Sequence, residues 1–190
     1  MNGDGQQFQQ IYEDFHERIF RYLARMVGEA EAEDLTQDVF VKIGLALETF
    51  RGDSQLSTWL YKIATNAAID LLRRTSTRRD NSRQLGSLDE KNGKECIAGG
   101  MIEGEQRIIK QEMNGCIRNV IDTLPDAYRS VIILSELEGL QDNEIAEILG
   151  ISLQEAKIRL HRARARLRQE MQKACVLYQD EQGELACDRK

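Results

Sequence analysis

Cationic side chains gather in one segment near the C-terminal end of this chain. Residues 151–173 contain seven Lys or Arg and two Asp or Glu, a local net charge of +5 in a chain of 190 residues whose net charge is −6. A run of charge is usually a solvated helix face. Inside an acidic chain, however, a cationic segment favours nucleic-acid binding, because Lys and Arg neutralise phosphates and release their counterions. We therefore expect nucleic-acid contact here.

A second group of residues, within 50–74, has the chemistry to hold unpaired bases. Two aromatic rings, a lysine, an amide and two arginines make up this group: Phe50, Trp59, Lys62, Asn66, Arg73 and Arg74. Aromatic faces stack on exposed bases, and an amide can read a base edge. A single Trp at helical spacing is more often a core residue, so the residues alone leave base stacking and core packing open for Trp59.

The basic segment is part of a helix-turn-helix pattern at 141–170. Apolar residues at helical spacing predict a first short helix that ends at Gly150. Ser152 followed by Glu155 matches a capping box, so a second helix should begin near Leu153. Its inward stripe is expected to contain Leu153, Ala156, Leu160, Ala163 and Leu167. A second helix of this kind can enter the DNA major groove.

Helical periodicity also covers most of the remaining chain. Three helices are expected before about residue 74, and four from about residue 113 onward. Between them, residues 75–105 contain few large apolar side chains and five glycines, which indicates a flexible linker. We predict an all-α fold with two small helical domains. The expected segments are a first domain at 1–78, a linker at 79–112, a helix-turn-helix domain at 113–173 and an acidic tail at 174–190.

Composition excludes several classes of protein. No apolar run approaches the ~20 residues of a membrane-spanning helix, and the N-terminus lacks a signal-peptide pattern, so we expect a cytoplasmic protein without membrane insertion. With two His, no phosphate loop and no Ser-His-Asp pattern, neither an enzyme nor a cofactor is predicted. The four cysteines are separated by 19, 58 and 11 residues, which fits no usual zinc spacing: Cys96, Cys116, Cys175 and Cys187.

Four segments resemble the extracytoplasmic-function (ECF) sigma factors, a branch of the bacterial sigma-70 family. They are AEDLTQDVFVKIGLAL at 32–47, FRGDSQLSTWLYKIATNAAIDLLRR at 50–74, LPDAYRSVIILSELEGLQDNEIAEILGIS at 124–152, and the basic helix that follows. The resemblance is specific, because two separate domains match in the right order across a linker of suitable length. It implies a non-catalytic alternative sigma factor that binds core RNA polymerase and directs transcription initiation at particular promoters.

The resemblance also implies roles for residues of the first domain. In this family that domain docks on the clamp helices of the largest polymerase subunit and opens the minus-10 promoter element. By motif position, the residues that would face the polymerase are Asp34, Leu35, Gln37, Asp38 and Phe40. Those that would surround the non-template strand are Phe50, Asp53, Trp59, Lys62 and Asn66. Arg73 and Arg74 would hold backbone phosphates, and Asn66 would lie near a flipped base.

The second domain resembles the family's reader of the minus-35 element, which also meets the flap of the second-largest subunit. The residues at base-reading positions are Lys157, Ile158, His161 and Arg162. Three further arginines are better suited to phosphates: Arg159, Arg164 and Arg166. Many relatives have a small polar residue where this chain has Ile158, so contact with a thymine methyl group is expected there.

Other interpretations stay open at this point. A stand-alone helix-turn-helix regulator would bind duplex DNA without polymerase, whereas a protein-binding adaptor would not explain the +5 segment. The tail is expected to be a disordered acidic end; alternatively, Cys175 and Cys187 could bind a metal or form a regulatory redox pair. The family usually has an anti-sigma partner, and one is expected here.

Overall fold

The computed structural model describes the backbone of residues 3–84, 117, 119–179 and 185–189, and the side chains of residues 5–76, 117 and 119–173. It confirms an all-α fold with two helical parts. The first part consists of α1 (Gly3–Val27), α2 (Glu29–Ala46), the 3-10 turn η1 (Leu47–Thr49) and α3 (Leu56–Gln84). The second consists of α5 (Asp126–Ile132), the π-helical turn η2 (Ile133–Leu137), α6 (Asp142–Leu149) and α7 (Leu153–Ala174). Within the described residues, no helix is long and apolar enough to cross a membrane.

The three N-terminal helices pack on one another around an apolar core. The largest fully buried side chains of this core come from all three helices: Ile19, Tyr22, Leu23, Met26, Ile43, Leu60 and Tyr61. Gly28 has φ +97°, a conformation that glycine adopts without steric cost, and it lets α2 begin one residue after α1 ends. Gly44 permits close approach of α1, because a Cβ atom there would lie 3.3 Å from the Phe8 ring.

Helix α3 continues ten residues beyond its predicted end at Arg74, to Gln84. Polar residues follow Arg74, but neither Gly nor Pro interrupts them before Gln84. Thr75 and Ser76 also satisfy their hydroxyl groups within the helix, since they donate to the carbonyls of Leu72 and Arg73 at 2.9 Å. The segment expected as linker therefore begins as helix at 79–84, and residues 85–112 lie outside the described part of the chain.

The helix-turn-helix pattern forms as predicted, with one difference at the second helix start. Gly150 ends α6 in the left-handed conformation, at φ +64° and ψ +35°. The Ser152 hydroxyl then accepts the Glu155 backbone N–H at 3.1 Å, which caps α7. The Glu155 carboxylate pairs with Arg159 at 2.6 Å, so only the Ser152 half of the predicted capping box is observed.

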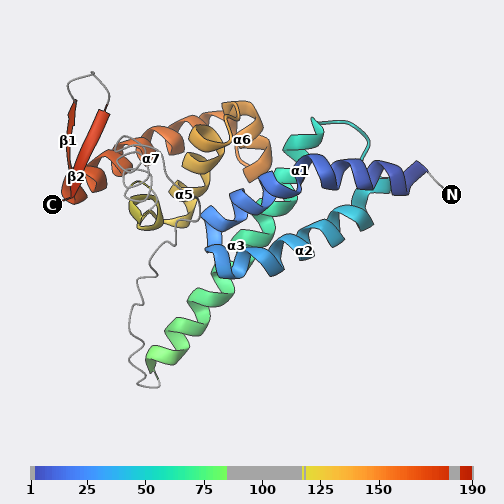
Figure 1. Cartoon of the computed structure of the whole chain (residues 1–190), viewed down its shortest axis with the longest axis horizontal. Coiled ribbons are helices and arrows are strands. Elements are labelled where there is room, and N and C mark those ends of the chain that lie inside the picture. Colours follow the sequence, from blue (N-terminus) through green and yellow to red (C-terminus); the bar gives the residue numbers. More distant parts are fainter. Residues whose placement is uncertain (1–2, 85–116, 118, 180–184, 190) are drawn as a thin grey trace, which may run out of the picture.

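The two helical parts pack directly against each other (Figure 1). Helix α6 lies against α3, and α5 and η2 lie against α1. A continuous cluster of buried apolar residues runs through both parts. The contact also has polar anchors, because the Arg129 guanidinium reaches across and donates to the Met26 carbonyl at 3.0 Å.

A buried carboxylate joins the two parts at the centre of this contact. Glu138 follows η2, and its side chain is only 7% exposed. One carboxylate oxygen accepts from Arg25 of α1 at 2.9 Å, and the other accepts from the Tyr61 hydroxyl of α3 at 2.5 Å. Burial and this carboxylate raise the pKa of the Tyr61 phenol, so Tyr61 stays a neutral donor. We refer to Arg25, Tyr61 and Glu138 as the interdomain cluster.

A two-stranded antiparallel hairpin follows α7, in the segment that was expected to be a disordered acidic tail. Strand β1 (Cys175–Gln179) pairs with β2 (Leu185–Arg189), on the side of α7 away from α1 to α3 (Figure 1). The tail is therefore structured in these two segments instead of being a disordered end. In the register, Cys175 is opposite Arg189 and Cys187 is opposite Leu177, so the two cysteines are not cross-strand partners.

Candidate nucleic-acid interface

Helix α7 presents one packed side and one open side. Ala156, Leu160 and Ala163 are buried against the rest of the second part. The residues expected at base edges are all exposed: Lys157, Ile158, His161 and Arg162. The three arginines expected at phosphates are each paired with a carboxylate, Arg159 with Glu155, Arg164 with Glu136 and Arg166 with Glu170, at distances of 2.6 to 3.0 Å.

The cationic residues expected at base edges differ from these three arginines in their ion pairs. Among the residues that the structure describes, none forms an ion pair with Lys157 or Arg162. Their charged ends therefore need no internal bond to be broken before they contact an acceptor. The paired arginines can exchange a surface carboxylate for a phosphate at small cost, because exposed ion pairs contribute only about 0 to 1 kcal/mol.

Leu153 differs from its prediction. It was expected on the inward stripe of the second helix, but its side chain is 44% exposed, as is that of Ile158. Leu153 is the first residue of α7, so the preceding turn of helix that would have covered it is absent. Two exposed aliphatic side chains therefore lie on a helix where half of the other exposed residues are Lys or Arg.

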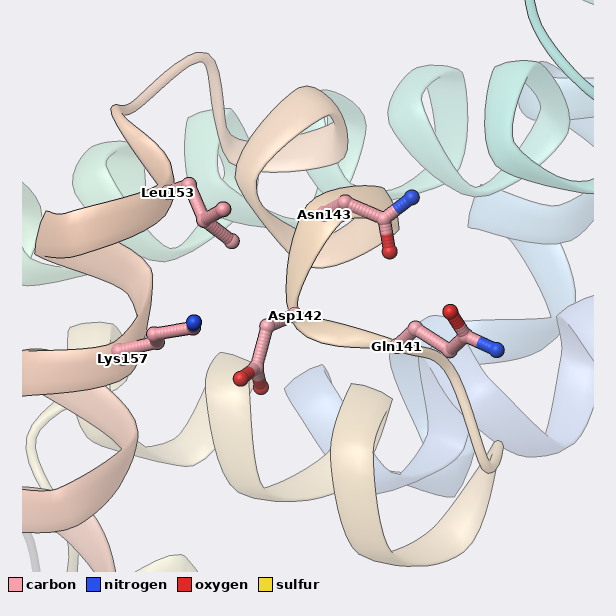
Figure 2. Close-up of a pocket in the computed structure, with 5 residues that line it drawn as sticks. All are labelled: Gln141, Asp142, Asn143, Leu153 and Lys157. Carbon is pink, nitrogen blue, oxygen red and sulfur yellow. The ribbon is translucent and has the colours of Figure 1, made fainter.

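Leu153 borders an open hollow between the starts of the two helices of the helix-turn-helix unit (Figure 2). Lys157 lies one turn further along α7 and extends toward the start of α6 (Figure 2). Three residues at the start of α6 line the other side of the hollow: Gln141, Asp142 and Asn143.

The expected base-capturing residues come together on the first part of α3 and the loop before it. The rings of Phe50 and Trp59 are 5.0 Å apart and tilted by 40°. Trp59 is half-buried and packs against the core, and base stacking on its exposed part stays a prediction. Lys62 and Asn66 are exposed one and two turns later along α3.

The remaining members of this group extend along the same element and its loop. Asp53 is exposed in the loop, next to Gly52, whose φ of +75° bends the chain there. Arg73 and Arg74 are exposed two turns after Asn66. A ring pair, an ammonium, an amide and two guanidinium groups thus follow one another from the loop along α3.

The residues expected to face the polymerase divide into two classes. Asp34, Gln37 and Asp38 are exposed on α2. Leu35 and Phe40 are only 9% and 3% exposed, and they belong to the core. Their side chains are therefore not available on this surface, and they hold α2 against α1 and α3.

Sequence reasoning missed two exposed apolar side chains beside this acidic face. Val41 and Leu45 lie one turn apart on α2 and are the most exposed of the large apolar side chains in the described part of the chain. Their positions fall outside the inward stripe at Leu35, Val39 and Ile43, so helical periodicity could have identified them.

Both helical parts match known sequence families. Residues 11–78 match sigma-70 region 2, and residues 114–167 match sigma-70 region 4. The ECF RNA polymerase sigma factor SigW of Bacillus subtilis is 32% identical over 170 residues, which cover 89% of this chain and 91% of SigW. This chain belongs to the ECF sigma factors of the sigma-70 family. It therefore directs promoter-specific transcription initiation, and it is a non-enzymatic initiation factor.

Two solved structures share the fold of this sigma factor. The sigma factor RpoE of Bartonella quintana, crystallised with the anti-sigma factor NepR, has a TM-score of 0.67 at 21% identity and covers 88% of this chain and 98% of its own. CnrH, in complex with the cytosolic domain of CnrY, has a TM-score of 0.61 at 24% identity and covers 90% of this chain and 91% of its own.

Proposed function

We propose that this sigma factor divides promoter recognition between α7 and the start of α3. Helix α7 reads the minus-35 element of duplex DNA, and the Phe50 to Asn66 region captures unpaired bases of the minus-10 element. The observation that carries this proposal is the pair of separate open surfaces, one cationic and one aromatic, on two parts of one chain. The domain of residues 1–78 takes the second task, and the domain of residues 113–173 takes the first.

The exposed residues of α7 read the bases of the minus-35 element. Lys157 and Arg162 donate to guanine or thymine acceptors, and Ile158 contacts a thymine methyl group. His161 lies one turn beyond Lys157 and lines the same groove. Arg159, Arg164 and Arg166 bind phosphates, which positions the helix without reading sequence.

The Phe50 and Trp59 rings and the Asn66 amide capture the unpaired bases of the minus-10 element. Stacking on Trp59 contributes on the order of 1 to 3 kcal/mol per base, which offsets part of the few kcal/mol that unpairing costs. Asn66 reads the flipped base, while Lys62, Arg73 and Arg74 hold the non-template strand. The Asp53 carboxylate repels phosphates, so base edges and not the DNA backbone contact this loop.

Core RNA polymerase binds the exposed face of α2. Asp34, Gln37 and Asp38 supply polar contacts to the clamp helices of the largest subunit, and the neighbouring apolar pair Val41 and Leu45 adds desolvated area. The helix-turn-helix domain meets the flap of the second-largest subunit. Bacterial transcription takes place in the cytoplasm, so the sigma factor acts there.

The two helical parts pack together in the resting form of the protein, and they separate when it binds the promoter. The minus-35 and minus-10 elements are named for positions about 25 base pairs apart, which is about 85 Å of DNA at 3.4 Å per base pair. The Thr58 hydroxyl, next to Trp59, donates to the Glu144 carboxylate of the helix-turn-helix unit at 3.5 Å. Two domains packed together at this point cannot place α7 and the start of α3 that far apart, so the interdomain cluster must break. An anti-sigma factor that binds the packed form would keep the readers together.

Replacing Glu138 with glutamine should shift this sigma factor toward the open form. Glutamine keeps an acceptor for Tyr61 but loses the charge paired with Arg25, which weakens the contact by about 1 kcal/mol, or about fivefold in the closed-to-open ratio. Pulsed EPR between labels at Glu33 and Gln169, in a chain with its cysteines replaced by serine, measures the two populations. Glu136→Gln is the matched control, because its partner Arg164 lies in the same domain. Equal distance distributions for both variants and the unsubstituted chain would refute the role of Glu138.

Transcript mapping tests the proposed function in the cell. Overexpression of the chain should induce a set of transcripts whose start sites share two upstream elements at a constant spacing. Substitutions in the first element should be compensated by changes on α7, and substitutions in the second by changes on α3. Induced transcripts that share only one element would contradict the division of labour.

A further inference from the structure

Leu153 has a solvent-exposed aliphatic side chain at the position where a recognition helix enters DNA. It is the first residue of α7, and the N-terminal residues of such helices are those that contact base edges. Its 44% exposure leaves much of an apolar surface uncovered by the residues that the structure describes. In the major groove of DNA, the apolar group on a base edge is the C5-methyl group of thymine.

Lys157 lies on the same face of α7, one turn after Leu153, and both side chains project into one hollow (Figure 2). Residues four apart on a helix have Cβ atoms about 5 to 6 Å apart. Thymine presents its methyl group on C5 and its acceptor O4 on the adjacent ring carbon. An aliphatic side chain and an ammonium group at this spacing therefore match the two features of one thymine edge.

Asp142 favours a base over a phosphate in this hollow. It lines the hollow from the start of α6, across from Lys157 (Figure 2). A phosphate placed there would meet a negative charge, whereas a thymine edge is uncharged. The carboxylate also attracts the Lys157 ammonium group toward the hollow.

We propose that Leu153 and Lys157 together read one thymine of the minus-35 element, with Leu153 on the methyl group and Lys157 on O4. The proposal rests on the function of α7 given above and adds a specificity-determining residue to it. Lysine alone accepts guanine as readily as thymine, since guanine also presents acceptors. Leu153 discriminates between them, because guanine has no methyl group there. Cytosine is rejected by its N4 donor, which faces the ammonium group.

Uracil replacement tests this contact, because uracil is thymine without the methyl group. The full chain is assembled with core RNA polymerase, and equilibrium binding is measured on a promoter fragment from its own transcripts. Each minus-35 thymine is replaced in turn by deoxyuridine. At one position, affinity should fall about fourfold, the factor for one buried methyl group. Leu153→Ala should lose a similar factor on the thymine promoter and show no further loss with uracil there.

Two comparisons make the test specific. Leu137→Ala removes a leucine that is 42% exposed but lies outside the helix-turn-helix unit, and it should keep the full uracil effect. Ile158→Ala should abolish uracil sensitivity at a different thymine. If Leu153→Ala keeps every uracil effect, or no thymine is uracil-sensitive, the Leu153 contact is overturned while promoter binding itself stands. A holoenzyme without promoter-specific binding would instead overturn the proposed function and this contact together.

Discussion

Replacing Arg162 with alanine is expected to lower the affinity of the holoenzyme for its minus-35 element by about tenfold to a hundredfold. A bidentate arginine contact to a base edge contributes about 1 to 3 kcal/mol of discrimination. Arg162 is exposed on α7, and no described residue forms an ion pair with it. Its guanidinium group is therefore available to DNA. Closed-complex binding, measured at a temperature too low for promoter opening, gives the affinity on the native and a scrambled element.

Arg168→Ala is the matched control for this prediction. Arg168 is also an exposed arginine of α7, but it lies nearly two turns further along the helix. Its loss removes the same charge and should weaken binding to the native and the scrambled minus-35 element alike. The affinity should then depend less steeply on salt concentration. Equal loss of selectivity in the two variants would show that Arg162 acts by charge alone.

Replacing Asn66 with alanine should slow promoter opening by about tenfold and leave closed-complex affinity nearly unchanged. Asn66 is exposed on α3, two turns after Trp59, and we propose that it reads the edge of the flipped base. Loss of a contact made only to the flipped base raises the barrier to opening, within the range of 1 to 3 kcal/mol for base capture. The fluorescence of 2-aminopurine in the minus-10 element reports the opening rate.

Arg162→Ala provides the reciprocal comparison for Asn66→Ala. It should reduce closed-complex affinity and leave the opening rate of bound complexes unchanged. If both variants reduce closed-complex affinity to the same extent, duplex reading and base capture are not divided between α7 and α3.

Local sequence signals predicted the elements that carry the candidate interface. Gly150 ends α6 and Ser152 caps α7 as expected, because a left-handed glycine and a hydroxyl cap act within a few residues. The exposed positions of Lys157 and Arg162 also followed from helical periodicity. Such features depend on the backbone of one helix and do not require knowledge of its neighbours.

Features set by neighbouring elements were not predicted. Leu153 fits the inward period of α7, but it lies at the helix start, where the described elements leave it 44% exposed. Leu35 and Phe40 match a polymerase-facing motif, yet packing against α1 and α3 buries them. Glu138 carries no local signal of its role, because its partners Arg25 and Tyr61 are 113 and 77 residues away. The hairpin at β1 and β2 depends on a strand pairing that neither segment specifies alone.

Transcription in a purified system tests whether this chain acts as a sigma factor with separate readers on α7 and α3. Core RNA polymerase is supplied with the full chain and a promoter fragment from its induced transcripts, and the products are sized. We expect transcripts from one start site, and only when the chain is present. Arg162→Ala should lower their yield at low holoenzyme concentration, and Asn66→Ala should slow their appearance at saturating holoenzyme. A chain that protects the minus-35 DNA on its own, yet yields no promoter-specific transcript with core polymerase, would not be a sigma factor that acts in this way.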